Sequence, residues 1–286
     1  MTSIIRLAVQ KSGRLSEDSL SLIRDCGIEI PSQKDKLKTT ATNFPIELFF
    51  LRDDDIPGYV EDGVADIGIA GENVVIEKGK QVDILHKLGF GKCRLSLAVP
   101  KTTEYYSIHD LAGKGIATSY PRILGNYLEK NGVKAHIHEI SGSVEIAPSI
   151  GLSDAICDLV SSGSTLFQNN LKEVEVVLQS QAVLIGCRSL SQEKRKLIEQ
   201  LVFRIKALQR AKNNKYVLLN APKYAIESII KILPGMKSPT VVPLAEEGWV
   251  SIHSVIDEND FWNKIENLKE AGAQGILVVP IEKMIL

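Results

Sequence analysis

A hydroxyl-rich turn is the strongest chemical feature of this sequence. The apolar run Asp154–Val160 leads into the turn Ser161–Thr165, and a helical pattern follows. Small residues let the backbone approach an anion, successive N–H groups point at it, and the helix N-terminus adds partial positive charge. The segment therefore predicts a phosphate cradle in which Asp158 accepts hydrogen bonds from the two hydroxyls of a ribose. The alternative is a tight turn and N-cap, with Asp158 bonded to backbone.

Asp154 and Asp158 are expected to have separate roles. A strand rises ~3.3 Å per residue, so the two carboxylates would share a face yet lie ~13 Å apart in an extended run. Asp154 then precedes the strand and, with Glu145, is a candidate pair of ligands for a divalent metal. A solvated loop acid is the alternative for Asp154.

Two basic clusters follow predicted strands. Lys11 and Arg14 come after the first strand, and Arg52 follows another strand directly before Asp53–Asp55. Ligands of α/β folds bind where strand ends meet at one edge of the sheet. Lysine and arginine there could neutralise a pyrophosphate leaving group, which stabilises transition-state charge. Surface charges are the alternative, and Asp53–Asp55 before a proline also suits the start of a helix.

Two further strand-to-loop junctions carry polar side chains. Gly68–Asn73 is one, and Thr118–Pro121 is the other, where Tyr120 either stacks on a purine or packs in a cleft wall. His136 and His138 could share a strand face as metal ligands. No third ligand stands near them, so we assign this pair no role.

The elements that position these groups are typical of an α/β protein. Short apolar runs alternate with helical patterns over the first two thirds of the chain, as in mostly parallel sheets. Seven strands are many for one small sheet, so we expect two lobes, with Pro100–Asp110 as a candidate crossing segment. A helix is predicted over Ser16–Cys26, ending at Gly27. The predicted strands are Ile4–Val9, Ile46–Leu51, Asp66–Ala70, Leu95–Val99, Gly115–Thr118, Ala155–Val160 and Ala182–Ile185.

The last third of the chain has a different order of elements. A helix from Gln192 to about Lys212 carries one apolar stripe, and a β-α-β-β-α-β pattern follows it. Inward helix faces at 3–4 spacing indicate a two-layer, ferredoxin-like module. The six predicted elements are Tyr216–Leu219, Lys223–Leu233, Thr240–Leu244, Val250–Val255, Asp260–Ala271 and Gly275–Val279.

Composition excludes several classes of function. The 286 residues are 24% charged and 44% hydrophobic with a net charge of −1, so neither disorder nor nucleic-acid binding is expected. Cys26, Cys93, Cys157 and Cys187 form no C-x-x-C pair, and we interpret them as free thiols. No apolar run approaches the ~20 residues that span a bilayer, and the N-terminus lacks a secretion pattern. We therefore expect a cytoplasmic protein without membrane partners.

Taken in order, these segments resemble the ATP phosphoribosyltransferase family in its long form. The resemblance covers nearly the whole chain. The segments that carry it are Gln10–Glu17, Arg52–Pro57, Asp66–Asn73, Cys93–Ala98, Ala117–Pro121, Gly142–Pro148, Asp154–Leu166, Ser238–Leu244 and Pro280–Met284.

The resemblance implies a catalytic part of two lobes shaped like type II periplasmic binding proteins, followed by a ferredoxin-like (ACT-like) domain. It places lobe I at 1–94 plus 181–211, lobe II with the phosphoribosyl pyrophosphate loop at 95–180, and a regulatory domain at 212–286. The implied reaction is magnesium-dependent transfer of the 5-phosphoribosyl group from phosphoribosyl pyrophosphate to N1 of ATP, the first step of histidine biosynthesis. Histidine as inhibitor, AMP as a further ligand, and homo-oligomers, dimer and hexamer, are implied as well.

The resemblance also implies roles for particular residues. Ser162 and Ser164 stand where relatives commonly have Thr and Ala, and Asn220 replaces an acid or histidine. The implied phosphoribosyl pyrophosphate site is Asp158, Ser161, Ser162, Gly163, Ser164 and Thr165. Lys11, Arg14 and Arg52 would face the pyrophosphate or triphosphate, Glu72, Asn73 and Tyr120 the adenine, and Glu145 with Asp154 the magnesium. The effector pocket would hold Asn220, Met236, Thr240 and Gly275.

Three other functions compete with this interpretation. A non-catalytic ligand-binding protein is the rival from another class, because the same bilobal fold serves solute receptors and regulator domains. A receptor would need an export signal and a regulator a DNA-binding module, and the sequence shows neither pattern. Transfer to a different acceptor base, and catalysis that depends on a partner subunit, are the remaining alternatives.

Overall fold

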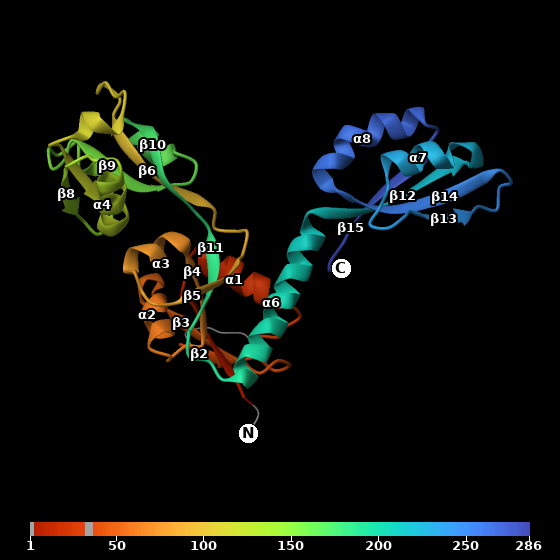
Figure 1. The fold of residues 1–286 in the computed structure, drawn as a ribbon, viewed down its shortest axis with the longest axis horizontal. Helices are drawn as coiled ribbons and strands as arrows, with labels where there is room; N and C mark the ends of the chain where they lie inside the picture. The colour runs from red at the N-terminus through yellow and green to blue at the C-terminus, as the bar shows by residue number, and fades with distance from the viewer. Residues whose placement is uncertain (1–2, 32–36) are drawn as a thin grey trace. The chain divides into compact units, whose positions relative to one another are not determined.

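The computed structural model describes residues 3–31 and 37–286. The chain forms two compact units, Met1–Glu199 and Gln200–Leu286, each with its own sheets. Figure 1 shows two sheets in the first unit and a third, in blue, in the second. Among the described residues, no helix combines the length and the apolar character needed to cross a bilayer.

The first sheet has the order β2-β3-β1-β4-β11-β5. Its centre is parallel, since β1 pairs in parallel with β3 and β4, while β11 runs antiparallel to β4 and β5. The central strands are buried on both faces, so they are continuous apolar runs. Its elements are β1 (Ile5–Gln10), α1 (Arg14–Asp25), β2 (Lys38–Thr40), β3 (Ile46–Leu51), η1 (Asp53–Asp55), α2 (Ile56–Glu61), β4 (Ile67–Gly71), α3 (Glu72–Lys78), β5 (Asp83–Lys87) and β11 (Ala182–Gly186).

The second sheet has the order β10-β6-β9-β7-β8. Here β7 pairs in parallel with β8 and β9, and β6 runs antiparallel to β9 and β10. Its elements are β6 (Cys93–Pro100), η2 (Ile108–Leu111), β7 (Gly115–Thr118), α4 (Pro121–Lys130), β8 (His136–Glu139), η3 (Val144–Ile146), β9 (Ala155–Val160), α5 (Ser164–Gln168) and β10 (Leu171–Ser180). We call the two sheets with their helices the first and second lobe.

The chain passes between the lobes twice, from β5 to β6 and from β10 to β11. The expectation that Pro100–Asp110 makes a crossing is therefore wrong, because β6 and β7 on either side of it belong to one sheet. Its polar composition comes from a surface loop, which ends in a capping box between Ser107 and Asp110 at the start of η2.

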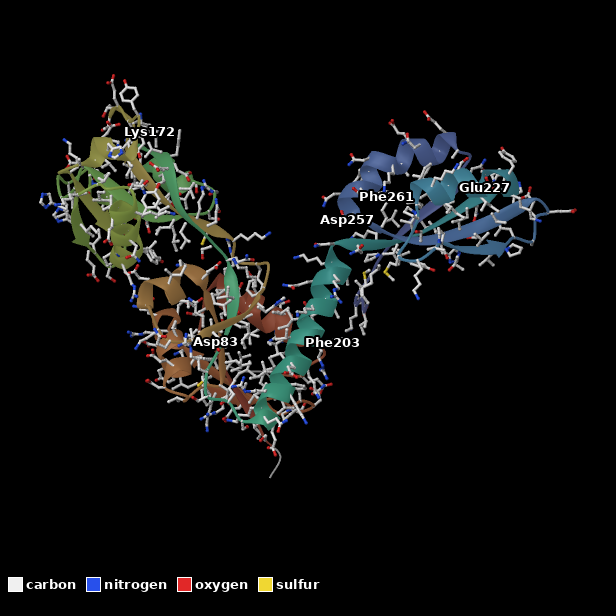
Figure 2. All side chains as sticks on the ribbon, in the orientation of Figure 1. Asp83, Lys172, Phe203, Glu227, Asp257 and Phe261 are labelled. Carbon is white, nitrogen blue, oxygen red and sulfur yellow. The ribbon has the colours of Figure 1, made fainter. Side chains whose placement is uncertain are left out.

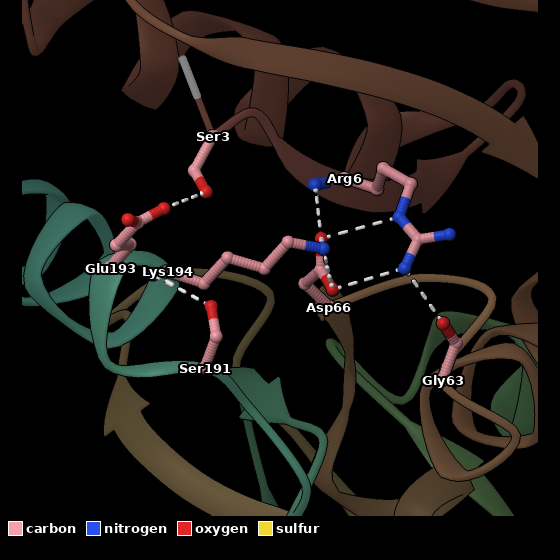
Figure 3. Close-up of polar contacts among 7 residues, drawn as sticks. All are labelled: Ser3, Arg6, Gly63, Asp66, Ser191, Glu193 and Lys194. Carbon is pink, nitrogen blue, oxygen red and sulfur yellow. Dashed lines mark hydrogen bonds and ion pairs between the residues drawn. The ribbon is translucent and has the colours of Figure 1, made fainter. Parts of the chain in front are cut away.

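A buried ion cluster fixes the amino end of β4 to β1 and to the helix α6 (Gln192–Lys212). The side chain of Asp66 is 4% exposed and accepts hydrogen bonds from the backbone and guanidinium of Arg6 and from Lys194 Nζ, the last at 2.8 Å (Figure 3). Burial would raise the pKa of Asp66, but the hydrogen bonds from Arg6 and Lys194 outweigh it and hold the pKa below its usual range. This cluster joins three segments that are distant in sequence.

The second unit confirms the predicted β-α-β-β-α-β order. An antiparallel sheet, β13-β14-β12-β15, packs on α7 and α8 around buried residues such as Ile229 and Leu268. Figure 2 shows Asp257 and Phe261 at the first turns of α8, where the Asp257 carboxylate caps the helix by accepting from Asn259 N at 2.9 Å. The elements are α6 (Gln192–Lys212), β12 (Asn214–Pro222), η4 (Lys223–Ala225), α7 (Ile226–Ile232), β13 (Thr240–Pro243), β14 (Trp249–Asp257), α8 (Glu258–Glu270) and β15 (Gln274–Pro280).

Candidate active site

The predicted cradle lies at the carboxyl end of β9 in the second lobe. Gly163 adopts φ +82°, a left-handed conformation that favours glycine, and α5 begins at the next residue. The hydroxyls of Ser162 and Ser164 lie 3.0 Å apart, and both side chains are exposed, as are those of Ser161 and Thr165. Ser164 N donates only a long bond to Ser162 Oγ, at 3.4 Å, so exposed hydroxyls and the N–H groups of a first helical turn lie together in a segment that suits an anion.

Arg94 on β6 holds this turn through a hydrogen bond to its first residue, Ser161. Its Nη1 donates to the carbonyl of Ser161 at 3.1 Å, while Nε and Nη2 form a bidentate pair with Glu173 at 2.5 and 2.6 Å. Ser96 Oγ also donates to Glu173, at 2.8 Å. The hydrogen bonds from Arg94 lower the pKa of Glu173. Sequence reasoning missed this anchor, although a charged residue on an otherwise apolar strand was a usable signal.

Asp158 lies on β9, three residues before the cradle, and has few hydrogen-bond partners. Its Oδ1 accepts a hydrogen bond from the adjacent N–H of Leu159 at 2.8 Å. Burial raises the pKa of Asp158, the Leu159 bond opposes this, and the nearby Glu145 carboxylate raises it further. A half-buried acid with spare acceptor capacity suits the hydroxyl pair of a ribose.

Glu145 and Asp154 are not placed as one pair. Glu145, on η3, acts electrostatically on Asp158, near the cradle. Asp154 instead precedes β9 and accepts a hydrogen bond from Gly115 N at 2.8 Å, at the amino ends of the parallel strands β7 and β9. A six-residue strand spans about 20 Å, which separates Asp154 from the cradle. It lines a cavity of about 810 Å³ together with His136 and His138.

Asn73 and Tyr120 meet although they come from different lobes. Asn73 Nδ2 donates to the Tyr120 hydroxyl at 3.2 Å, and Ser180 Oγ, in the second crossing, donates to Asn73 Oδ1 at 2.8 Å. Burial and then Asp158 raise the pKa of Tyr120, with further contributions from Asp53 and Asp54. The Tyr120 hydroxyl thus stays protonated and lies among carboxylates of both lobes. Glu72, predicted beside them, forms an ion pair with Lys87 at 3.1 Å.

Asp53 is a second acid in this region with an oxygen that lacks a hydrogen-bond partner among the described residues. That oxygen, Oδ1, is buried. Burial and then the neighbouring Asp54 raise the pKa of Asp53 to about 6, against a lowering effect of Lys78. Asp54 itself pairs with Lys78 at 3.2 Å. The sequence allowed Asp53 only a helix-starting role, and nothing local distinguished it from Asp54.

The three predicted basic residues gather at the carboxyl edge of the first sheet. Lys11 follows β1 and Arg52 follows β3, two paired parallel strands, and Lys11 N donates to Leu51 O at 2.8 Å. Arg14 is the first residue of α1. All three side chains are exposed, and within residues 3–31 and 37–286 none has an ion-pair partner. They remain available to an anionic ligand.

Three of the predicted effector residues lie on one face of the third sheet or directly beside it. Thr240 on β13 pairs with His253 on β14, and paired residues share a face. Asn220 pairs with Ser251 two residues along, on that same face away from α7 and α8. The Asn220 amide lies 3.4 Å from where a Cβ on Gly275 would stand. Met236 is 56% exposed in the loop before β13.

Two α/β lobes joined by two crossings define a bilobal protein of the type II periplasmic-binding-protein fold, here followed by a ferredoxin-like domain. A sulfonate-binding protein, SsuA, from Methylobacillus flagellatus shares the fold alone, with a TM-score of 0.51 and 17% identity over 73% of this chain and 69% of that one. A chain of the ATP phosphoribosyl transferase (HisG:HisZ) complex from Thermotoga maritima matches with a TM-score of 0.60 and 29% sequence identity, over 71% of this chain and 99% of that chain.

Sequence comparison is more specific. A family model described as ATP phosphoribosyltransferase matches residues 52–207, and one described as the HisG C-terminal domain matches residues 211–283. The ATP phosphoribosyltransferase of Cytophaga hutchinsonii is 60% identical over 285 residues, covering 100% of both chains. This chain therefore belongs to the ATP phosphoribosyltransferase family, a family of pentosyltransferases, in the long form that includes the C-terminal domain.

Proposed function

We propose that this enzyme transfers the 5-phosphoribosyl group of phosphoribosyl pyrophosphate to N1 of ATP, giving N1-(5-phosphoribosyl)-ATP and pyrophosphate. The reaction would be the first step of L-histidine biosynthesis, carried out in the cytoplasm. The observation that carries the proposal is the cradle at 161–165, anchored by Arg94 beside a partner-poor Asp158. It occurs in a chain that matches a named ATP phosphoribosyltransferase over its full length.

The chemistry needs positioning more than a reactive side chain. The N1 lone pair of adenine attacks C1 of the ribose while the bond from C1 to the pyrophosphate oxygen breaks, so no covalent enzyme intermediate is required. The cradle holds the 5-phosphate and Asp158 accepts the ribose hydroxyls. Asn73, Tyr120 and Glu72 line the adenine side. Holding both reactants in line lowers the entropic part of the barrier.

Charge that develops on the leaving group needs fixed cations. Lys11, Arg14 and Arg52 are exposed at the carboxyl edge of the first sheet, and we assign them to the pyrophosphate or the triphosphate. Cations that are already in place stabilise a departing anion without reorganisation during the reaction. Asp158 and Glu145 lie on the other lobe, so the two lobes would supply opposite charges to the reacting centre.

Magnesium suits the carboxylates near the cradle. Mg²⁺ is usually held by one or two carboxylates together with substrate phosphates. Among the described residues no group of three or more His, Cys, Asp or Glu side chains is arranged to hold a metal ion. We assign the metal to Glu145 and Asp158 in place of the predicted pair Glu145 and Asp154, because Asp154 lies at the opposite end of β9, where it accepts a hydrogen bond from Gly115 N. The metal would supply neutralisation of the pyrophosphate charge.

The proposed division of labour follows the lobes. Residues 1–94 with 181–211 would form catalytic lobe I, residues 95–180 catalytic lobe II, and residues 212–286 the regulatory domain. Arg94 comes from β6 of the second sheet, and the cradle is the turn that follows β9 of the same sheet. The three basic residues come from the edge of the first sheet.

The third sheet is proposed as the sensor of histidine. Asn220, Thr240 and Gly275 lie at one sheet face or its edge, with the exposed Met236 in the loop before β13. Feedback inhibition there requires two global states with different histidine contacts, which we assign to dimer and hexamer, with AMP as a second ligand. Thr240→Trp should weaken histidine inhibition and preserve uninhibited turnover. Unchanged inhibition would remove Thr240 from the pocket.

The proposed activity is tested by ultraviolet absorbance. Purified protein is mixed with ATP, phosphoribosyl pyrophosphate and magnesium, with pyrophosphatase to pull the reaction forward, in the presence and absence of histidine. Product formation that histidine suppresses is the expected result. Formation without suppression would keep the enzyme and reject the sensor. No product from folded protein that binds nucleotide would reject the activity and favour a binding protein or a missing partner.

A further inference from the structure

A side chain of the first lobe caps a helix of the second. Glu77 on α3 accepts hydrogen bonds from two N–H groups in the first turn of α4, Arg122 N to Oε1 at 2.9 Å and Ile123 N to Oε2 at 3.0 Å. The chain offers α4 no local cap, because the Tyr120 side chain at the N-cap makes no capping bond to the helix and Pro121 has no N–H. The carboxylate therefore satisfies donors that are otherwise unpaired in a helix.

The contact is reciprocal. The guanidinium of Arg122 lies against Gly79, the C-cap of α3, so closely that a Cβ there would stand 1.6 Å from Nη1. Gly79 has φ +59° and leaves this space open. A helix C-terminus carries partial negative charge, which favours a cation. The carboxyl end of α3 and the amino end of α4 are thus clasped from both sides, and we call Glu77, Gly79 and Arg122 the interlobe clasp.

The clasp lies next to the two residues assigned to adenine. Asn73 stands at the start of α3 and Tyr120 immediately before α4, and their side chains bond at 3.2 Å. Because these residues come from different lobes, their relation depends on how α3 and α4 are held together. The cradle differs, since Arg94, Glu173 and Ser161 all belong to the second lobe. Releasing the clasp would therefore disturb the adenine side and leave the cradle intact.

We propose that Glu77 is a positioning residue for the nucleotide, which acts through the first turn of α4 to hold Tyr120 against Asn73. Arg122 over Gly79 is the second half of the same device. The inference rests on the proposed function and deepens it, because it assigns adenine recognition to a contact between lobes and recognition of the 5-phosphate to the cradle of the second lobe alone.

Glu77→Gln tests this directly. A glutamine of the same shape has one acceptor oxygen, and its NH₂ faces the second helical N–H, so one of the two bonds is lost. Charge-assisted bonds are the stronger kind, and we expect the KM for ATP to rise about tenfold. The KM for phosphoribosyl pyrophosphate should stay within about twofold, because local bonds within one lobe are untouched. Hydrogen exchange at the amides of Arg122 and Ile123 should become faster.

Two further variants keep the test decisive. Glu129→Gln removes an exposed carboxylate from the same helix and should change neither KM nor exchange. Gly79→Asn displaces the Arg122 guanidinium while leaving that residue in the chain, and asparagine tolerates the left-handed conformation. It should raise the KM for ATP by a smaller factor, and it serves if Glu77→Gln does not fold.

The outcomes separate the two claims. A wild-type enzyme without turnover would reject the proposed function, whatever the variants do. An active wild-type enzyme whose Glu77→Gln variant keeps its KM for ATP and its exchange rates would overturn the clasp. An equal rise in both KM values would also overturn it, because that result describes general loosening of the catalytic part.

Discussion

Asp66 directly precedes one buried strand of the first unit and Asp158 lies on another, but the two carboxylates differ in their partners. Asp66 has two cationic partners, and Asp158 has none within the described parts of the chain. Asp66 stands before β4, where Arg6 and Lys194 donate to it and its pKa lies below the usual range. Asp158 stands near the carboxyl end of β9, where a neighbouring backbone N–H is the partner of Oδ1 and burial raises its pKa. Asp53, with a buried oxygen lacking a partner in the described structure, resembles Asp158.

The difference separates an acid that stabilises the fold, Asp66, from an acid whose hydrogen-bonding capacity remains for a ligand, Asp158. A buried acid with two cations contributes to folding, because each charge is compensated within the chain. A buried acid without them costs folding free energy and keeps its acceptor capacity for another molecule, and such groups cluster at functional sites. Substituting each acid should therefore separate stability from activity.

The largest expected effect is on catalysis by Asp158→Asn. Losing the acceptor for the ribose hydroxyls should lower kcat/KM by roughly 10²–10³. The free energy of unfolding at pH 7 should be unchanged or higher, because a poorly solvated charge is removed. Steady-state kinetics and urea unfolding measure the two effects. Asp154→Asn, at the other end of β9, is the matched control and should retain activity, and an inactive control would return Asp154 to the site.

Asp66→Asn should have the opposite pattern: it should lower stability and leave catalysis unchanged. Removing one charge of a buried ion cluster leaves Arg6 and Lys194 uncompensated and should lower the free energy of unfolding by roughly 3 kcal/mol. Because the folded pKa of Asp66 is lowered, its stabilisation is present above about pH 4 and is lost as the pH falls through the folded value. Urea unfolding at several pH values measures it. If the folded Asp66→Asn variant, measured well below its melting temperature, had a reduced kcat, the assignment of Asp66 to stability alone would be contradicted.

Asp53→Asn should stabilise the protein by an amount that depends on pH. The pKa of Asp53 is raised to about 6, so its ionisation opposes folding increasingly between about pH 4 and pH 6, fully above pH 6, and not below about pH 4. The gain at pH 8 should be on the order of 2 kcal/mol. Urea unfolding of both proteins at about pH 4 and at pH 8 tests this, and a pH-independent difference would show that Asp53 has an internal partner.

Arg94→Ala should have the smallest effect of the four substitutions. It removes the partner of Glu173, an ion-paired acid beside the cradle. Without Arg94 the Ser161 carbonyl is no longer held, and the KM for phosphoribosyl pyrophosphate should rise about tenfold with the KM for ATP unchanged. Arg188→Ala is the matched control, because it removes an exposed arginine from an ion pair with Asp83 in the first lobe. Equal effects of both variants on either KM would exclude a special role for Arg94.

The fold was predictable where strands are buried on both faces. All seven predicted strands of the catalytic part exist, because β1, β4, β9 and β11 are apolar runs in sheet interiors. Four others were missed: β2, β5, β8 and β10. In β5 and β8 nearly every residue is exposed or half-buried and charged or polar side chains are frequent, so no alternation marks them. Edge strands gain their structure from a neighbour's backbone, which composition does not reveal.

The site was predictable where one segment supplies all the chemistry. The cradle follows from local residues, and strand ends placed the basic groups at one edge. The clasp of Glu77 and Arg122 and the anchor at Arg94 depend on segments that meet only in the folded chain. The spacing of Asp154 and Asp158 correctly indicated separate positions, but the sequence could not show that Glu145, on η3, lies near Asp158 and not near Asp154.

The most direct test is the map of hydrogen-exchange protection when phosphoribosyl pyrophosphate and magnesium are added without ATP. The account predicts protection of the amides in 158–166, with the segment around Asp66 unchanged and the same map lost in Asp158→Asn. Protection centred on the cavity lined by His136, His138 and Asp154, with 158–166 unaffected, would contradict it.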